Sequence, residues 1–147
     1  MQQIDTHLVY SASDLVTAAE CEFAAARRVD ETLGLIPRAD LPEDALMKRA
    51  AALGDAFEAM LIAGMVAEYG ESASGVVQMP RPQPGRLENL AAAQRATVQA
   101  AADGAAVITQ AVLFDGRLLG YADFLIRQPD GSYAVADAKL ARSAKVR

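Results

Sequence analysis

The chain has 147 residues, which suits a single globular domain. It is 52% hydrophobic and 22% charged, too apolar for a disordered protein, and we expect no apolar run long enough to span a bilayer. The formal charge of -5 argues against nucleic-acid binding over a broad basic surface, so any such contact should be local.

Cys21 is the only cysteine, which excludes intrachain disulfides and a self-contained four-cysteine metal or iron–sulfur site. The first residues have neither the basic nor the apolar region of a signal peptide, so we expect a cytoplasmic protein. Residues 139–147 include four basic residues and no acid, which suits a local contact with DNA. Because no capped element closes the chain, we expect one domain, 1–147, that belongs to a longer protein.

Helical patterns dominate the first two thirds of the sequence. Residues 10–14 offer a Ser or Asp N-cap for a helix that continues to about Arg28, with Cys21 on its buried face and Arg27 and Arg28 complementing its dipole. A capping box with proline at 40–43 opens a long helix that Gly70 ends. Its predicted core stripe consists of Leu46, Ala50, Leu53, Phe57, Met60 and Leu61.

A change of pattern follows a proline-rich loop at 80–85 and a further helix at 87–102. From residue 105 onward, apolar runs of strand length alternate with turn dipeptides, which predicts an antiparallel meander of strands 107–114, 117–127 and 132–140. The expected fold is therefore α/β, with N-terminal helices packed on a small mixed sheet.

Two acids interrupt the predicted strands, and the loop between them predicts how they face each other. Pro129, Asp130 and Gly131 suit a three-residue hairpin loop, which pairs residues whose numbers sum to 260. Asp123 and Asp137 would then lie directly opposite on one face of the sheet. A two-residue loop at 130–131 would instead place them on opposite faces.

Like charges at that separation repel, so a cation should lie between them. Strand alternation puts Lys139 on the same face as Asp137. Two carboxylates suit Mg²⁺ or Mn²⁺, and a neighbouring lysine can orient water and stabilise negative charge, which indicates phosphodiester hydrolysis. The simpler alternative is a pair of solvent-exposed acids with Lys139 as their counter-charge.

An ordered set of motifs resembles a known family. Asp123, followed by Asp-Ala-Lys at 137–139 on a hairpin after a helical half, resembles the PD-(D/E)XK nuclease core and its RecB-like branch. Residues 10–15 with Cys21 are similar to the serine, leucine and cysteine pattern that opens that branch. Leu-Gly-Asp-Ala-Phe-Glu at 53–58 resembles its glycine–histidine–glutamate helix.

The resemblance implies a restriction-endonuclease-like core and a function for each matching residue. Asp123 and Asp137 would bind Mg²⁺ or Mn²⁺, with the Ala138 carbonyl as a further ligand. Lys139 would be the catalytic lysine, and Glu58 would approach the metal from the long helix. The implied function is DNA cleavage in repair or recombination, acting on single strands or DNA ends, without a membrane and in a protein linked to a helicase.

Three departures from the family pattern leave an alternative open. Phe57 stands where many relatives have a metal-binding histidine, the family's glutamine–tyrosine helix does not follow Lys139, and cluster-forming cysteines are absent. Phe57 is then an ordinary core aromatic, and Glu58 a solvated helix residue. The chain would be a catalytically impaired module that binds DNA or a protein, or a simple oligomeric scaffold.

Overall fold

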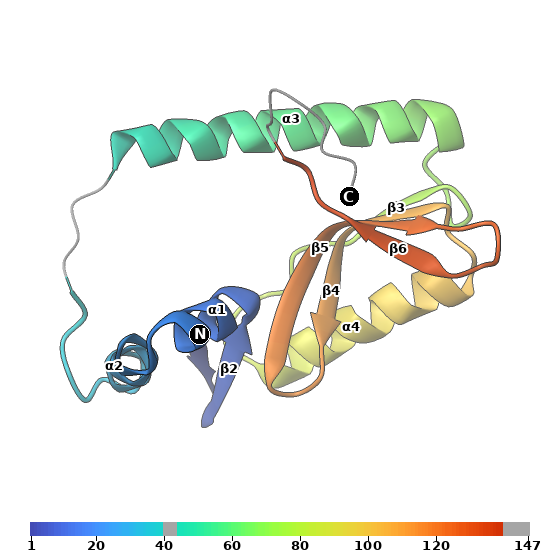
Figure 1. Ribbon diagram of the computed structural model, residues 1–147. Helices are drawn as coiled ribbons and strands as arrows, with labels where there is room; N and C mark the ends of the chain where they lie inside the picture. Colours follow the sequence, from blue (N-terminus) through green and yellow to red (C-terminus); the bar gives the residue numbers. More distant parts are fainter. Residues whose placement is uncertain (40–43, 140–147) are drawn as a thin grey trace.

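Within its described residues, the protein is an α/β domain in which four helices pack around a mixed sheet of six strands (Figure 1). The structure is a computed structural model that describes residues 1–39 and 44–139. In chain order the elements are β1 (Gln2–Ile4), β2 (His7–Ser11), α1 (Ala12–Glu20), α2 (Glu22–Thr32), α3 (Ala45–Tyr69), β3 (Val76–Gln78), α4 (Leu87–Ala102), β4 (Val107–Phe114), β5 (Leu118–Arg127) and β6 (Tyr133–Ala136).

The sheet has the order β1-β2-β5-β4-β3, with β6 as an additional partner of β5. β2 pairs with the start of β5 and β3 with β4, both in parallel, while the remaining pairs are antiparallel. The predicted meander of β4, β5 and β6 is confirmed. Its third strand ends at Ala136, however, so Asp137 and Lys139 follow the strand instead of lying within it. Residue 140, the expected strand end, lies outside the described residues.

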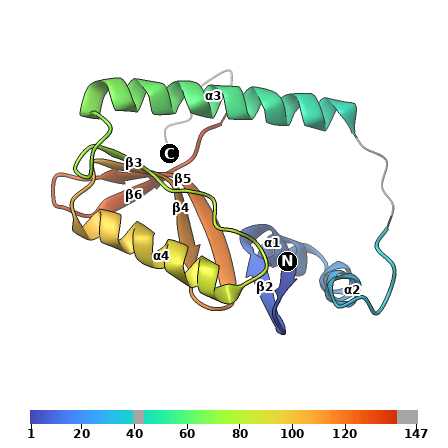
Figure 2. The ribbon, with the colours of Figure 1, turned by 180° about the vertical axis from the view of Figure 1, so that it is seen from behind.

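α4 covers one face of the sheet and also satisfies the free edge of β4 (Figure 2). Because β3 pairs only with residues 107–109, the following backbone donors of β4 need other partners. The Val112 N–H donates to Thr97 Oγ1 at 3.1 Å, and the Phe114 N–H donates to Gln94 Oε1 at 2.9 Å. Polar side chains of α4 thus replace a missing strand, which fixes the position of β4.

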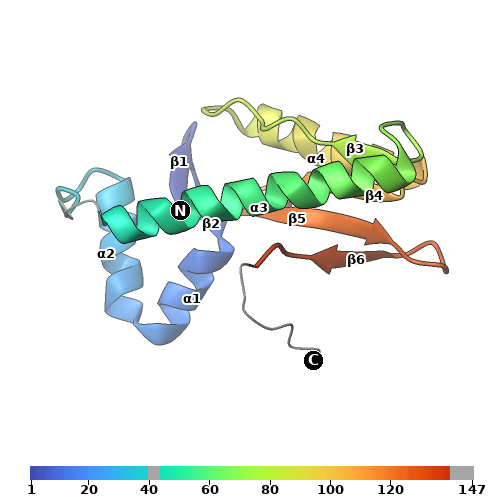
Figure 3. The same cartoon turned by 90° about the horizontal axis from the view of Figure 1, so that it is seen from above.

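α3 crosses the opposite face, and only its C-terminal half contacts the core (Figure 3). That half packs against a cluster of Val76, Val107 and Phe124 through Leu61, Ile62, Met65 and Val66. The predicted core stripe is wrong for the N-terminal half, since Leu46 is 74% and Leu53 63% exposed, and it is also wrong at Met60, which is 59% exposed. The expected burial fails there because no described element lies against these side chains. α3 begins at Ala45, capped by Asp44, and the predicted capping box at 40–43 lies outside the described residues.

The length and composition of α3 also correct one expectation about the membrane. The helix is long and apolar enough to cross a bilayer by those two criteria, because alanines keep a 25-residue helix apolar without forming a continuous run of large residues. The criteria alone also admit long helices of soluble proteins. Asp55 and Glu58 lie near the middle of α3, where a bilayer would disfavour charge.

The N-terminal region differs from its predicted single helix. β1 and β2, an antiparallel pair, precede the helices and were not expected. Cys21 has extended backbone and divides the helix into α1 and α2. Its sulfur accepts a 3.5 Å hydrogen bond from the Ala24 N–H, and the side chain is exposed, so the predicted burial of Cys21 is wrong. Cys21 is the N-cap of α2, so it lies between two helices and not in the middle of the single predicted one.

Candidate functional site

The loop between β5 and β6 has the predicted three-residue form. The Gln128 N–H donates to the Ser132 carbonyl at 2.7 Å, and the Gly131 N–H donates back to the Gln128 carbonyl at 2.9 Å. Gly131 has a φ of 85°, and Asp130 Oδ1 accepts a 2.9 Å hydrogen bond from the Ser132 N–H. A local turn therefore fixes the register of the hairpin.

That register brings the two predicted acids together. Phe124 pairs with Ala136, and Asp123 and Asp137 are the next residues on each side. Their carboxyl groups lie within hydrogen-bonding reach of each other. The prediction that these side chains meet is confirmed, and the alternative of a two-residue loop is excluded.

The two carboxyl groups differ in their affinity for a proton. Partial burial and the hydrogen bond with Asp137 raise the pKa of Asp123, and the negative charge of Glu58 raises it further. The hydrogen bond with Asp123 and the ammonium group of Lys139 lower the pKa of Asp137. These opposite shifts make Asp123 the more readily protonated of the two acids.

Lys139 and Ala138 complete the hairpin side of the site. Lys139 Nζ lies 2.6 Å from Asp137 Oδ2, and this pairing raises the pKa of Lys139. The strand alternation that predicted the contact does not extend to these residues, because β6 ends at Ala136. Their side chains are 78% and 53% exposed, which agrees with the simpler alternative of a solvent-exposed ion pair. The Ala138 N–H donates a 2.8 Å hydrogen bond to Asp123 Oδ2. The chain beyond β6 is thus held to β5 by a side chain instead of by the strand ladder.

Glu58 approaches this group from α3. It makes a contact with β4 that the sequence does not reveal. Its Oε1 accepts a hydrogen bond from Gln110 Nε2 on β4. Glu58 is partly buried, so its interpretation as a freely solvated residue is wrong. α3 and the hairpin therefore bring Glu58, Asp123 and Asp137 to one region of the sheet.

The donor set of this acidic group suits a hard divalent ion at its centre. Asp123 and Asp137 provide neighbouring carboxylate oxygens, which are the hard donors that Mg²⁺ and Mn²⁺ prefer. Within residues 1–39 and 44–139, no three His, Cys, Asp or Glu side chains are already arranged to hold a metal together. Glu58 influences Asp123 electrostatically, so a change of rotamer would have to bring it into the first coordination sphere.

Phe57, which occupies the histidine position of the resemblance, is neither a ligand nor a fully buried core residue. Its side chain is partly buried on α3, and no residue of that helix is fully buried. The expectation of a core aromatic is therefore not met, because α3 covers the sheet only with its C-terminal half.

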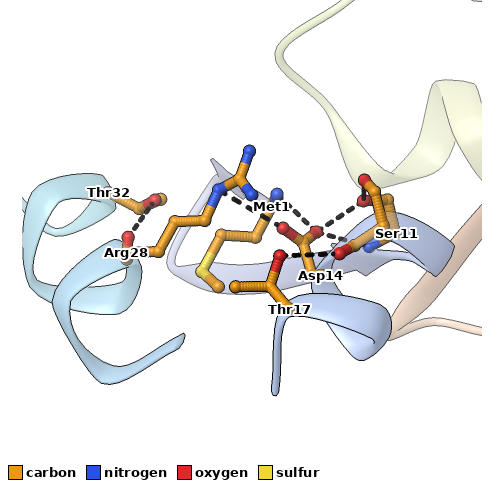
Figure 4. A network of polar contacts seen from close by, with 7 residues as sticks. Met1, Ser11, Asp14, Thr17, Arg28 and Thr32 are labelled. Carbon is orange, nitrogen blue, oxygen red and sulfur yellow. Dashed lines mark hydrogen bonds and ion pairs between the residues drawn. The ribbon is translucent and has the colours of Figure 1, made fainter. Parts of the chain in front are cut away.

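A second polar network, around Asp14, serves the packing of the N-terminal region (Figure 4). The 3% exposed Asp14 accepts hydrogen bonds from the Ser11 N–H at 2.8 Å and Oγ at 2.6 Å, and pairs with the Met1 amino group. Burial by itself would raise the pKa of Asp14, but these bonds outweigh it and lower the pKa to about 2. Arg28 Nε lies 3.5 Å from Asp14 Oδ1, which joins α2 to α1.

The arginine pair in α2 therefore has ionic partners instead of the predicted helix-dipole interaction. Arg27 Nε lies 3.0 Å from Glu31 Oε1, one turn further along the helix, and Arg28 pairs with Asp14. The dipole interpretation is wrong because α2 continues to Thr32 and its last turn contains no basic residue.

Gln110 is the site residue that sequence reasoning missed. Its backbone has a φ of 53°, a left-handed conformation that is uncommon for residues other than glycine. Glutamine in an apolar strand gives only a weak signal, because its partner Glu58 lies 52 residues earlier in the chain. Of the predicted basic segment 139–147, only Lys139 lies within the described residues.

Comparison of the chain with family models, curated proteins and solved structures finds no match.

Proposed function

We propose that the chain is a metal-dependent nuclease domain of the PD-(D/E)XK superfamily, of the RecB-like branch, with a restriction-endonuclease-like core. The observation that carries this proposal is the Asp123–Asp137 pair with Lys139 bonded to it, on a hairpin whose register is set by its own turn. The order of these residues along the chain agrees with the family motif, and Glu58 arrives from the preceding long helix.

The proposed functions of the residues follow from their chemistry. Asp123 and Asp137 would hold Mg²⁺ or Mn²⁺, with the Ala138 carbonyl and Glu58 as further oxygen ligands. The ion would supply Lewis-acid activation of a phosphate oxygen and of the attacking water. Lys139, whose ammonium group pairs with Asp137, would orient that water and stabilise charge that develops on the phosphate.

The proposed substrate is DNA in single-stranded form or at ends. With a net charge of -5, the chain lacks the excess of basic residues that binds long duplexes through many phosphates. A local site formed by the ion and Lys139 can still bind one or two phosphates of a flexible strand. We place this activity in the cytoplasm, away from any membrane, in DNA repair or recombination and in a larger, helicase-linked protein or complex.

One observation favours a second candidate, a nuclease-fold module that binds DNA or a protein partner without cleaving DNA. Phe57 cannot bind a metal, and the described residues contain no preformed group of three metal-binding side chains. A site with only two carboxylates would bind the ion weakly. The two candidates differ in Mn²⁺ affinity and in turnover, so both should be measured.

The decisive experiment measures cleavage of end-labelled single-stranded and duplex DNA with Mn²⁺ or Mg²⁺. We expect cleavage by the native chain and loss of at least about a hundredfold in Asp137→Ala and Lys139→Ala, because each removes a group from the reacting centre. Asp55→Ala, a change of an exposed acid on α3, is the matched control and should retain activity.

Equal cleavage by the native chain and Asp137→Ala would overturn the enzyme proposal. A native chain that binds DNA but cleaves none, with or without Mn²⁺, would instead favour the binding module. Calorimetric titration with Mn²⁺ tests the metal site directly, since affinity should fall in Asp123→Asn and Asp137→Ala but not in Asp55→Ala.

A further inference from the structure

The pairing between β4 and β5 is interrupted at one point, opposite Asp123. Thr109 pairs with Phe124 and Ala111 with Ala122, so the register places Gln110 across from Asp123, yet these two residues form no ladder pair. Gln110 instead has the left-handed φ of 53°. Its backbone conformation therefore departs from the strand next to a proposed metal ligand.

This irregularity also shifts the alternation of side chains. Ile108 and Ala111 lie in the same hydrophobic cluster on α4, although they are three residues apart, and so do Ala122 and Leu125 on β5. Regular strands place residues two apart on one face. The register is the same on both sides of the interruption, and there Gln110 contacts Glu58 of α3, on the face opposite α4.

The Gln110 side chain contacts α3. Nε2 donates a hydrogen bond to Glu58 Oε1, and both side chains are partly buried. Glu58 is negatively charged and lies close enough to Asp123 to raise its pKa. Without a donor, a flexible glutamate beside two further acids would turn away from them.

We infer that Gln110 is a positioning residue that holds the Glu58 carboxyl group toward Asp123 and Asp137, so that Glu58 can become the third ligand of the divalent ion. The inference rests on the proposed metal site. It explains the left-handed backbone of Gln110 by the function of this residue at that site. Disfavoured conformations of this kind persist where surrounding contacts hold them in place, and they concentrate at functional sites.

Glycine separates the structural effect of Gln110 from its effect on the site. Gln110→Gly accepts a positive φ without strain but removes the amide that binds Glu58. We expect a melting temperature equal to or above that of the native chain, together with Mn²⁺ binding weakened about tenfold or more. A residue with only a structural function would change both properties in the same direction.

A double-mutant cycle shows whether Gln110 acts through Glu58. Glu58→Ala should weaken Mn²⁺ binding at least as much as Gln110→Gly, and the double variant should be no weaker than Glu58→Ala alone. Asp55→Ala is the matched control on α3. Native-like Mn²⁺ affinity in Gln110→Gly, or losses that multiply in the double variant, would overturn the inference.

The same titrations separate this inference from the proposed function. If Mn²⁺ binds the native chain and Asp137→Ala abolishes binding while Gln110→Gly leaves it unchanged, only the inference about Gln110 falls. If the native chain binds no Mn²⁺, or Asp137→Ala binds it equally well, both fall.

Discussion

The backbone N–H of Ala138 donates a 2.8 Å hydrogen bond to Oδ2 of Asp123, so that the chain past the end of β6 remains attached to β5. This bond joins the backbone past β6 to a side chain of β5 after the strand ladder stops at Ala136. The same carboxyl group also interacts with Asp137, the second acid of the hairpin.

The raised pKa of Asp123 predicts how metal binding depends on pH. The pKa of Asp123 is raised, so Mn²⁺ must displace a proton below that pKa and none above it. We expect Mn²⁺ affinity to rise about tenfold per pH unit below the Asp123 pKa and to level off above it. Calorimetric titrations over a pH series measure this. Asp123→Asn should lose the rising limb, and a native affinity that is constant across the series would contradict the prediction.

The turn that sets the register should be sensitive to substitution at Gly131. Its φ is 85°, and a Cβ there would meet only the Arg127 guanidinium at 3.9 Å, so the penalty comes from the backbone alone. We expect Gly131→Ala to lower the free energy of unfolding by about 1–2 kcal/mol, as measured by urea denaturation. Gly64→Ala, in the open interior of α3, should raise it by about 0.5–1 kcal/mol. Changes of the same sign in both variants would count against this reason.

The junction between α3 and β3 depends on the absence of a side chain at Gly75. A Cβ at this position would overlap the carbonyl oxygens of Gly70 and Tyr69, which are backbone atoms and cannot simply rotate away. Gly75→Ala should therefore lower the free energy of unfolding by about 1–3 kcal/mol. Thermal melts followed by circular dichroism test this, with Gly54→Ala as a helix control. A change of about 1 kcal/mol shifts the melting temperature of such a domain by several degrees. A melting temperature within about one degree of the native value would therefore contradict the prediction.

The ion pairs of Asp14 predict a pH-dependent contribution to stability. The folded pKa is about 2, below the ordinary value of 3.8, so the ionised carboxylate stabilises the folded state above that ordinary value. We expect Asp14→Asn to lower the free energy of unfolding by about 2 kcal/mol at neutral pH. The difference between native chain and variant should shrink as the pH falls from 3.8 toward 2. Denaturation curves at several pH values measure it, and a constant difference would refute the ionic origin.

Local chemistry explains where the sequence predicted correctly. The Pro-Asp-Gly turn at 129–131 fixes the hairpin within a few residues, so the facing of Asp123 and Asp137 followed from the sequence alone. The same holds for Gly70, whose φ of 76° closes α3 where predicted. In each case the determining atoms lie within one turn of the chain.

Predictions failed where distant segments decide the outcome. The stripe on α3 predicted burial, but periodicity indicates only which side chains share a face, and not whether another element covers them. The helix break at Cys21 is accompanied by an ion pair between Arg28 of α2 and Asp14 of α1. Asp14 also pairs with the amino group of Met1, which precedes β1.

The sequence by itself determined an α/β domain with an acidic hairpin, because turn residues and strand periods act over short distances. Only the tertiary structure decided that Glu58 meets Gln110, and that Gln110 takes a left-handed backbone opposite Asp123. Those contacts join α3, β4 and β5, and their geometry depends on how the packed elements fit together, which no short stretch of sequence specifies.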